Sequence, residues 1–145
     1  MLKVFIDGAV EPINPGGVGT VGIIVYRDSE KIFREGKVTG EGPRMSNNRA
    51  EYEALREVLQ WLIDQGLSRE NVSVNSDSSL LVNQMQGRWK VKGGLYLNAY
   101  NECVQLARQF SSISFHWVER EENEEADLLA RNAYKEYRKE NSSIS

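Results

Sequence analysis

Histidine and cysteine are nearly absent from this 145-residue sequence, which contains one of each, His116 and Cys103. A single cysteine cannot form an internal disulfide, which fits a reducing, intracellular compartment, and we expect a cytoplasmic protein. Zinc sites are built mainly from Cys and His, so one of each, far apart in the sequence, serves zinc poorly. His116 falls within a predicted strand, where a cross-strand or surface role is favoured over catalysis.

Long apolar stretches and an excess of basic residues are also missing. No run approaches the ~18 apolar residues that a membrane span needs, and the first residues lead into a predicted strand rather than a signal peptide. We therefore expect no membrane association. The net charge of −3 argues against a protein that coats nucleic acid through bulk electrostatics, although it leaves room for one local basic patch.

The chain is long enough to bury one core: it has 145 residues, 40% of them hydrophobic, and no internal repeat. We expect one domain over residues 1–140 and a disordered tail over residues 141–145. The hydrophobic pattern predicts the order β-β-β-α-β-α-α-β-α. The expected strands are 2–7, 18–26, 31–38, 71–76 and 113–118, and the expected helices are 48–65, 78–85, 95–110 and 123–138.

Aspartates end two of the predicted strands. The first strand is a nearly continuous apolar run that leads to Asp7, the pattern of a central strand covered on both faces. A strand–helix–strand order implies a parallel crossover, so Asp7 and Asp77 are expected at the same rim of the sheet. Two carboxylates a few ångström apart repel by about 1–4 kcal/mol, depending on the effective dielectric. A divalent cation would make the pair favourable, whereas Asp7 taken alone could simply cap a turn.

Two further carboxylates fall on the apolar faces of predicted helices. Glu51 precedes Leu55 by four residues and Asp127 precedes Ala130 by three, so both are expected to point inward from a first turn. Glu51 has an alternative role, because with Asn48 as N-cap it could close a capping box. Hard oxygen ligands in this number suit Mg²⁺ or Mn²⁺, and paired Mg²⁺ ions suit in-line phosphoryl transfer. All four carboxylates are predicted at one rim: Asp7, Glu51, Asp77 and Asp127.

A basic stretch at residues 88–94 places Arg88, Lys90 and Lys92 around Trp89. The pattern is compatible with an exposed charged turn in which Trp89 folds back on the core. It is equally compatible with a contact to a phosphate backbone, with the aromatic ring available for a sugar or base.

Five short motifs occur in the order and spacing of a known family: Phe-Ile-Asp-Gly at 5–8, Asn-Pro-Gly-Gly at 14–17, Ser-Asn-Asn-Arg-Ala-Glu at 46–51, Ser-Asp-Ser at 76–78 and Glu-Asn-Glu-Glu-Ala-Asp at 122–127. Together they resemble ribonuclease H, type 1, over essentially the whole chain. The resemblance implies an α/β, ribonuclease H-like fold with a five-stranded mixed sheet flanked by helices. The first three strands would be antiparallel, and the first, fourth and fifth parallel.

The resemblance also implies an activity: endonucleolytic hydrolysis of the RNA strand of RNA–DNA hybrids by two Mg²⁺ ions, or Mn²⁺ in their place, leaving 3′-hydroxyl and 5′-phosphate ends. Carried over position by position, the catalytic metal ligands are Asp7, Glu51, Asp77 and Asp127. Asn14, Asn47 and Asn48 resemble the family's minor-groove contacts, where the 2′-hydroxyl distinguishes RNA from DNA. Further candidates for substrate contacts are Ser46, Arg49, Ser78, Trp89 and Lys90.

Two departures from the family pattern stand out. Many members carry a histidine between the last strand and the last helix, but residues 118–123 contain none, as in a compact branch that resembles archaeal and some bacterial members. Arg120 or Glu122 is a candidate for part of its role. Ser79 stands where a glutamine often follows the Asp-Ser pair, and the basic stretch is shorter than the protrusion of some relatives. We therefore expect weaker affinity for the hybrid.

Two other functions remain open at this point, alongside the expectation of a monomer that binds RNA–DNA hybrids. One is a nuclease of the same fold with relaxed specificity that includes double-stranded RNA. The other is a non-catalytic hybrid-binding module, which would need degraded carboxylates, whereas all four are present.

Overall fold

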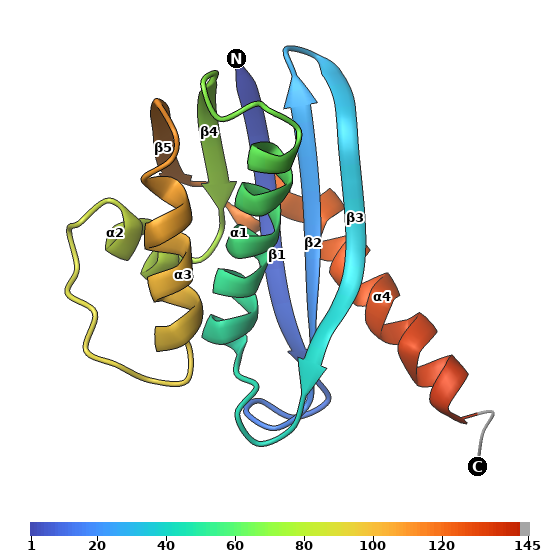
Figure 1. Cartoon of the computed structure of the whole chain (residues 1–145). Coiled ribbons are helices and arrows are strands. Elements are labelled where there is room, and N and C mark those ends of the chain that lie inside the picture. Colours follow the sequence, from blue (N-terminus) through green and yellow to red (C-terminus); the bar gives the residue numbers. More distant parts are fainter. Residues whose placement is uncertain (143–145) are drawn as a thin grey trace.

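A five-stranded sheet forms the middle layer of the computed structural model, which describes residues 1–142. The strand order is β3-β2-β1-β4-β5. Helices α1 and α3 cover one face of the sheet and α4 crosses the other (Figure 1). The strands are β1 (Leu2–Glu11), β2 (Val18–Arg27), β3 (Glu30–Glu41), β4 (Asn71–Ser76) and β5 (Ser112–Trp117). The helices are α1 (Asn47–Asp64), α2 (Ser79–Met85), α3 (Leu97–Ala107), the 3₁₀ turn η1 (Arg120–Asn123) and α4 (Glu124–Ser142).

The sheet has the mixed topology that the sequence predicted. β1 pairs antiparallel with β2, and β2 with β3, while β1 pairs in parallel with β4, and β4 with β5. The predicted fold class is therefore confirmed. The apolar stripe of α1 packs on the sheet. This packing fully buries Leu55, Val58, Leu59 and Leu62. Among residues 1–142, no helix is both long enough and apolar enough to cross a membrane.

Several boundaries differ from the sequence prediction, and β1 differs most. The strand does not end at Asp7 but continues to Glu11, because β2 pairs with it over its full length. β4 is shorter and pairs only with residues 2–6 of β1. Asp7 is therefore the first residue beyond the parallel pairing, inside the strand rather than at its end.

The start of α1 was also placed wrongly. The N-cap is Ser46, whose Oγ accepts a hydrogen bond from the backbone N–H of Arg49 at 3.2 Å, and not Asn48. With Ser46 as N-cap, Glu51 is the fifth helical residue, two positions beyond the third, from which a side chain closes a capping box. Glu51 therefore does not have the helix-capping role that the sequence left open.

Helix α4 extends further than expected and includes Asn141 and Ser142. These are the first two residues of the segment predicted as a disordered tail. The rest of that segment, residues 143–145, lies outside the described residues.

Close backbone approaches hold the helices on both faces of the sheet, and one of them lies beside Asp7. A Cβ on Gly8 would lie 2.3 Å from the carbonyl carbon of Ala50 and 2.4 Å from the amide nitrogen of Glu51. Only glycine therefore allows β1 to approach the first turn of α1 this closely. On the opposite face, a Cβ on Gly22 would lie 1.9 Å from the carbonyl oxygen of Ala126 in α4.

We expect Gly8→Ala to destabilise the protein by about 1–3 kcal/mol, because the backbone of α1 must move away to make room for the added methyl group. Gly40→Ala is the matched control, since its Cβ would meet only the flexible Met45 methyl at 3.2 Å. Urea denaturation of both variants measures the difference, and equal losses would contradict this account of Gly8.

Candidate active site

Three carboxylates from three different elements meet at the point where β1 and β4 stop pairing. They are Asp7 in β1, Glu51 in α1 and Asp77, which directly follows β4. One oxygen of each lies within 4.8 Å of the others. They line a pocket of about 490 Å³ that also includes Asp127. The parallel crossover from β1 to β4 and the tight contact between Gly8 and α1 together produce this convergence.

The carboxylates are held in an environment that disfavours their charge. Burial, followed by the charge of Asp77, raises the pKa of Asp7 to about 8. Burial, followed by the charges of Asp7 and Asp77, also raises the pKa of Glu51 well above its ordinary value. Burial also raises the pKa of Asp77, and the nearby charge of Arg120 opposes this shift. Such a cluster gains free energy from a cation placed among its oxygens.

The residues of this cluster fit a divalent metal ion. Glu51 Oε2 is buried and has no hydrogen-bond partner among residues 1–142, which is costly unless a ligand takes that place. The donors are all carboxylate oxygens, the type that Mg²⁺ and Mn²⁺ prefer. The residues that would hold the ions are Asp7, Glu51 and Asp77, with Asp127 beside them.

Asp127 approaches the cluster from the other face of the sheet. It lies in the first turn of α4, and its contact with Asp7 contributes to the raised pKa of Asp7. It does not belong to the closely spaced group of three oxygens. Instead, Asp127 Oδ2 pairs with Arg131 at 2.7 Å. Three carboxylates thus lie close together, and the fourth lies beside them, paired with Arg131.

The turn η1 connects β5 to α4 and closes one side of the pocket. Asn123 is buried, and its Nδ2 donates to the carbonyl oxygen of Ile6 at 2.8 Å, which fixes the turn to β1 next to Asp7. Arg120 lines the pocket, and its part in the role of the missing histidine stays a prediction. Glu122 is exposed and is not among the residues that line it.

The predicted substrate-contact residues are distributed over three regions. Asn47, Asn48 and Ser78 line the carboxylate pocket, and the Ser78 hydroxyl also caps α2. Asn14 Oδ1 accepts a hydrogen bond from the backbone N–H of Asn47 at 3.0 Å, which ties the β1–β2 loop to the start of α1.

The remaining candidates lie outside this pocket. Ser46 acts as the N-cap described above, and Arg49 lies on the side of α1 that faces α3. Trp89 is 48% exposed in the loop between α2 and α3, so it is not folded back on the core. Lys90 lies next to it and is also exposed.

Two large side chains of the pocket, Trp117 and Arg131, were not found from the sequence as site residues. Trp117 ends β5 and is 53% exposed. Arg131 also lines the pocket. Its spacing of four residues from Asp127 on one helix is a signal that could have revealed the ion pair.

Comparison with known proteins agrees with this geometry. Residues 6–133 match a family model described as reverse transcriptase-like. The bifunctional protein Rv2228c of Mycobacterium tuberculosis is 38% identical over 120 residues, which cover 83% of this chain and 32% of that protein. The chain thus spans about a third of the length of this relative and of its mycobacterial counterparts.

Two solved structures are similar over nearly their whole length. LC11-RNase H1 in complex with an RNA/DNA hybrid has a TM-score of 0.85 and 28% identity, covering 94% of this chain and 99% of that one. The N-terminal RNase H domain of Rv2228c has a TM-score of 0.82 and 33% identity, covering 97% of this chain and 99% of that one. Because the family model and the mycobacterial domain both span most of the sequence, this chain belongs to the type 1 ribonuclease H family.

Proposed function

We propose that the chain is an endonuclease that hydrolyses the RNA strand of RNA–DNA hybrids, with divalent ions held by Asp7, Glu51, Asp77 and Asp127. The observation that carries this proposal is the convergence of three carboxylates within 4.8 Å, one of them with a buried oxygen that has no partner. Family membership and the hybrid bound to LC11-RNase H1 support the choice of substrate.

The carboxylates would hold two Mg²⁺ ions, or Mn²⁺ in their place, which lower the pKa of an attacking water and stabilise the departing oxygen. Products with 3′-hydroxyl and 5′-phosphate ends require the water to attack phosphorus while the 3′-oxygen leaves. The protein's own contribution is to keep its acidic groups fixed. Asp7 and Asp77 each directly follow the last residues that pair between β1 and β4, and Glu51 is buried in the first turns of a helix packed on the sheet.

Selection of RNA would depend on the asparagines beside the carboxylates. Asn47 and Asn48 line the same pocket as the carboxylates, and an amide can both donate to and accept from a 2′-hydroxyl. Arg49, Trp89 and Lys90 would contact the backbone farther from the cleavage site. The chain would act as a monomer, since all four carboxylates come from one molecule.

Asp7→Asn is expected to reduce cleavage of a labelled RNA–DNA hybrid in Mg²⁺ by more than about 100-fold, because loss of a direct ligand costs more than loss of an outer-sphere partner. Asp28→Asn is the matched control. Asp28 is 81% exposed at the β2–β3 turn, where it pairs with the terminal amino group, and its replacement should leave the rate unchanged.

Parallel reactions with double-stranded RNA and double-stranded DNA define the substrate range. Cleavage of double-stranded RNA at a similar rate would favour the relaxed nuclease. Hybrid binding without cleavage, in either Mg²⁺ or Mn²⁺, would contradict the proposed reaction and favour a binding module.

The raised pKa of Asp7 predicts a stability change in protein stripped of metal by a chelator. Asp7 retains its proton in the folded state up to about pH 8, whereas the unfolded chain ionises near 3.8, so the associated stability is lost as the pH rises through this interval. We expect Asp7→Asn to raise the melting temperature by about 2–8 °C at pH 8 and by less at pH 5.

Excess Mg²⁺ at pH 8 should reverse this order by stabilising the unsubstituted protein more than the variant. Differential scanning calorimetry at the two pH values, with and without Mg²⁺, measures both effects. A melting temperature of Asp7→Asn below that of the unsubstituted protein at pH 8 without metal would contradict the idea that ionised Asp7 destabilises the fold.

A further inference from the structure

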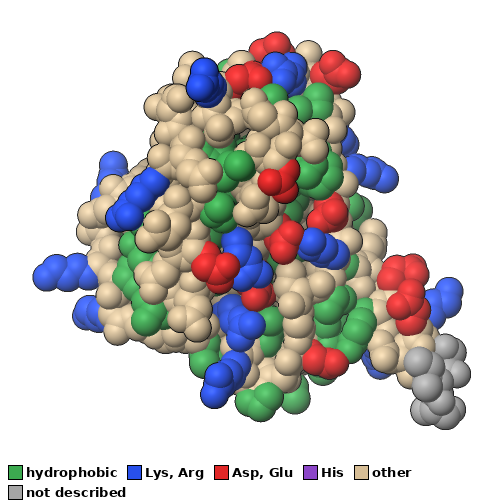
Figure 2. Space-filling view, viewed as in Figure 1, with side chains coloured by type: hydrophobic (Ala, Val, Ile, Leu, Met, Phe, Trp, Pro, Cys, Tyr) green, Lys and Arg blue, Asp and Glu red, His purple; other side chains and the backbone are tan. Residues whose placement is uncertain are grey.

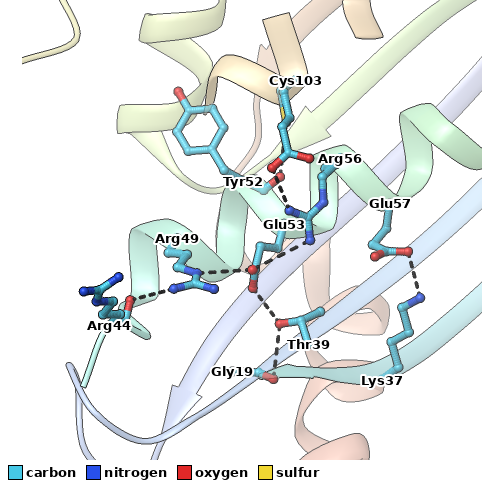
Figure 3. Close-up of polar contacts among 11 residues, drawn as sticks. Gly19, Lys37, Thr39, Arg44, Arg49, Tyr52, Glu53, Arg56, Glu57 and Cys103 are labelled. Carbon is cyan, nitrogen blue, oxygen red and sulfur yellow. Dashed lines mark hydrogen bonds and ion pairs between the residues drawn. The ribbon is translucent and has the colours of Figure 1, made fainter. Parts of the chain in front are cut away.

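A fifth carboxylate, Glu53, is almost completely buried on a different side of α1. Its side chain is only 3% exposed. Thr39 Oγ1 in β3 donates to Glu53 Oε1 at 2.7 Å, and Arg49 Nε donates to Oε2 at 3.2 Å (Figure 3). Arg56 lies at 3.7 Å from the same Oε2. The charge of Glu53 is therefore satisfied by groups from two elements of the fold.

The hydrogen bond that Arg49 donates to Glu53 fixes the orientation of the arginine side chain. The Arg49 guanidinium also donates from Nη1 to the carbonyl oxygen of Arg44 at 3.2 Å, so two of its nitrogens are held by partners on different segments. A planar guanidinium held at two points cannot rotate freely. It has five N–H groups, so these two bonds leave three for another ligand. The side chain is 32% exposed, which leaves part of it accessible from solvent.

Arg49 and Glu51 lie on different sides of α1, because residues two positions apart on a helix point away from each other. On the side of Glu51 is the carboxylate pocket. On the side of Arg49 is a groove of about 590 Å³ between α1 and α3, lined in part by Arg44, Arg49 and Arg56. Figure 2 shows basic side chains in a row down the middle of this face of the molecule, with acidic ones beside them.

We propose that Glu53 is a positioning residue, which holds the Arg49 guanidinium in the orientation that contacts a backbone phosphate of the bound hybrid. This inference rests on the proposed function. A carboxylate beside a phosphate-binding arginine lowers the local positive charge, and orientation of the arginine offsets that loss. Thr39 acts on the opposite side of the carboxylate, where its hydroxyl anchors Glu53 to β3.

Bulk electrostatics and positioning predict opposite effects for Glu53→Gln. The substitution removes one negative charge, so bulk electrostatics predicts tighter binding of a polyanion. Positioning predicts weaker binding, because the neutral amide holds Arg49 less firmly and more side-chain entropy is lost when the hybrid binds. Glu57→Gln is the matched control: it removes the same charge from the same helix, but Glu57 pairs with Lys37 at 2.7 Å and with none of the three arginines.

The experiment is steady-state cleavage of an RNA–DNA hybrid in Mg²⁺ by the unsubstituted chain and the two variants. Glu53→Gln should raise KM about three- to tenfold, because a charge-assisted hydrogen bond to Arg49 is replaced by a weaker neutral one, with kcat nearly unchanged. Glu57→Gln should leave KM unchanged or lower it. In a double-mutant cycle, Arg49→Gln combined with Glu53→Gln should raise KM no more than Arg49→Gln alone.

The inference is overturned if Glu53→Gln lowers KM or leaves it unchanged, if Glu57→Gln raises KM equally, if the two substitutions in the cycle are additive, or if only kcat changes. Should Glu53→Gln fail to fold in a melting experiment, Thr39→Val tests the same network through its other anchor. It should raise KM by a smaller factor, and an unchanged KM would overturn the inference.

Failure of the proposed function gives a different result. In that case the unsubstituted chain does not cleave the hybrid at all. Fluorescence anisotropy with the same hybrid then tests Glu53 through affinity alone, where Glu53→Gln should bind more weakly than Glu57→Gln, and equal or tighter binding would overturn the inference.

Discussion

Repulsion among carboxylates at the end of the β1–β4 pairing is the constraint on which the rest of this structure depends. Like charges a few ångström apart oppose one another by about 1–4 kcal/mol at intermediate dielectric, and burial adds to the cost. The surrounding fold holds them together nonetheless. Gly8 admits α1 against β1, and Asn123 fixes η1 to the carbonyl of Ile6. Arg120 and Arg131 supply positive charge at the rim.

Helix α1 separates two chemically different surfaces of the molecule. One side contributes Glu51 to an acidic pocket, and the other contributes Arg49 and Arg56 to a groove that also contains Glu53 and Glu102. Under the proposed function, a nucleic acid that crosses the start of this helix would meet carboxylate oxygens and arginine guanidiniums within two turns. This arrangement explains how a chain with a net charge of −3 can belong to a family of nucleic-acid enzymes. Local charge placement, rather than total charge, makes the surface suitable.

Much of the fold could be predicted because its signals are local or topological. An apolar run before Asp7 and the parallel crossover to Asp77 were sufficient to place both residues at one rim. The start of α1 was harder, because Ser46, Asn47 and Asn48 are all good N-caps and only the backbone geometry selects among them. The length of β1 depends on its pairing with β2, which no pattern within β1 itself reveals.

The polar contacts between distant segments could not be predicted from the sequence. In the sequence, Glu53 has no feature that distinguishes it from an exposed helical glutamate. In the structure it is buried, with Thr39 from β3 and two arginines of its own helix as partners. Trp117 ends the edge strand β5 and its side chain is 53% exposed, which the pattern of β5 alone does not indicate. Both cases require knowledge of which elements are neighbours in space.

The hydrogen bond from Asn123 to Ile6 joins residues 117 positions apart in the chain. Asp7 is synthesised before η1 and Asp127, which follow only after all five strands of the sheet. The four carboxylates therefore come together only when the last elements of the described chain dock on strands made earlier.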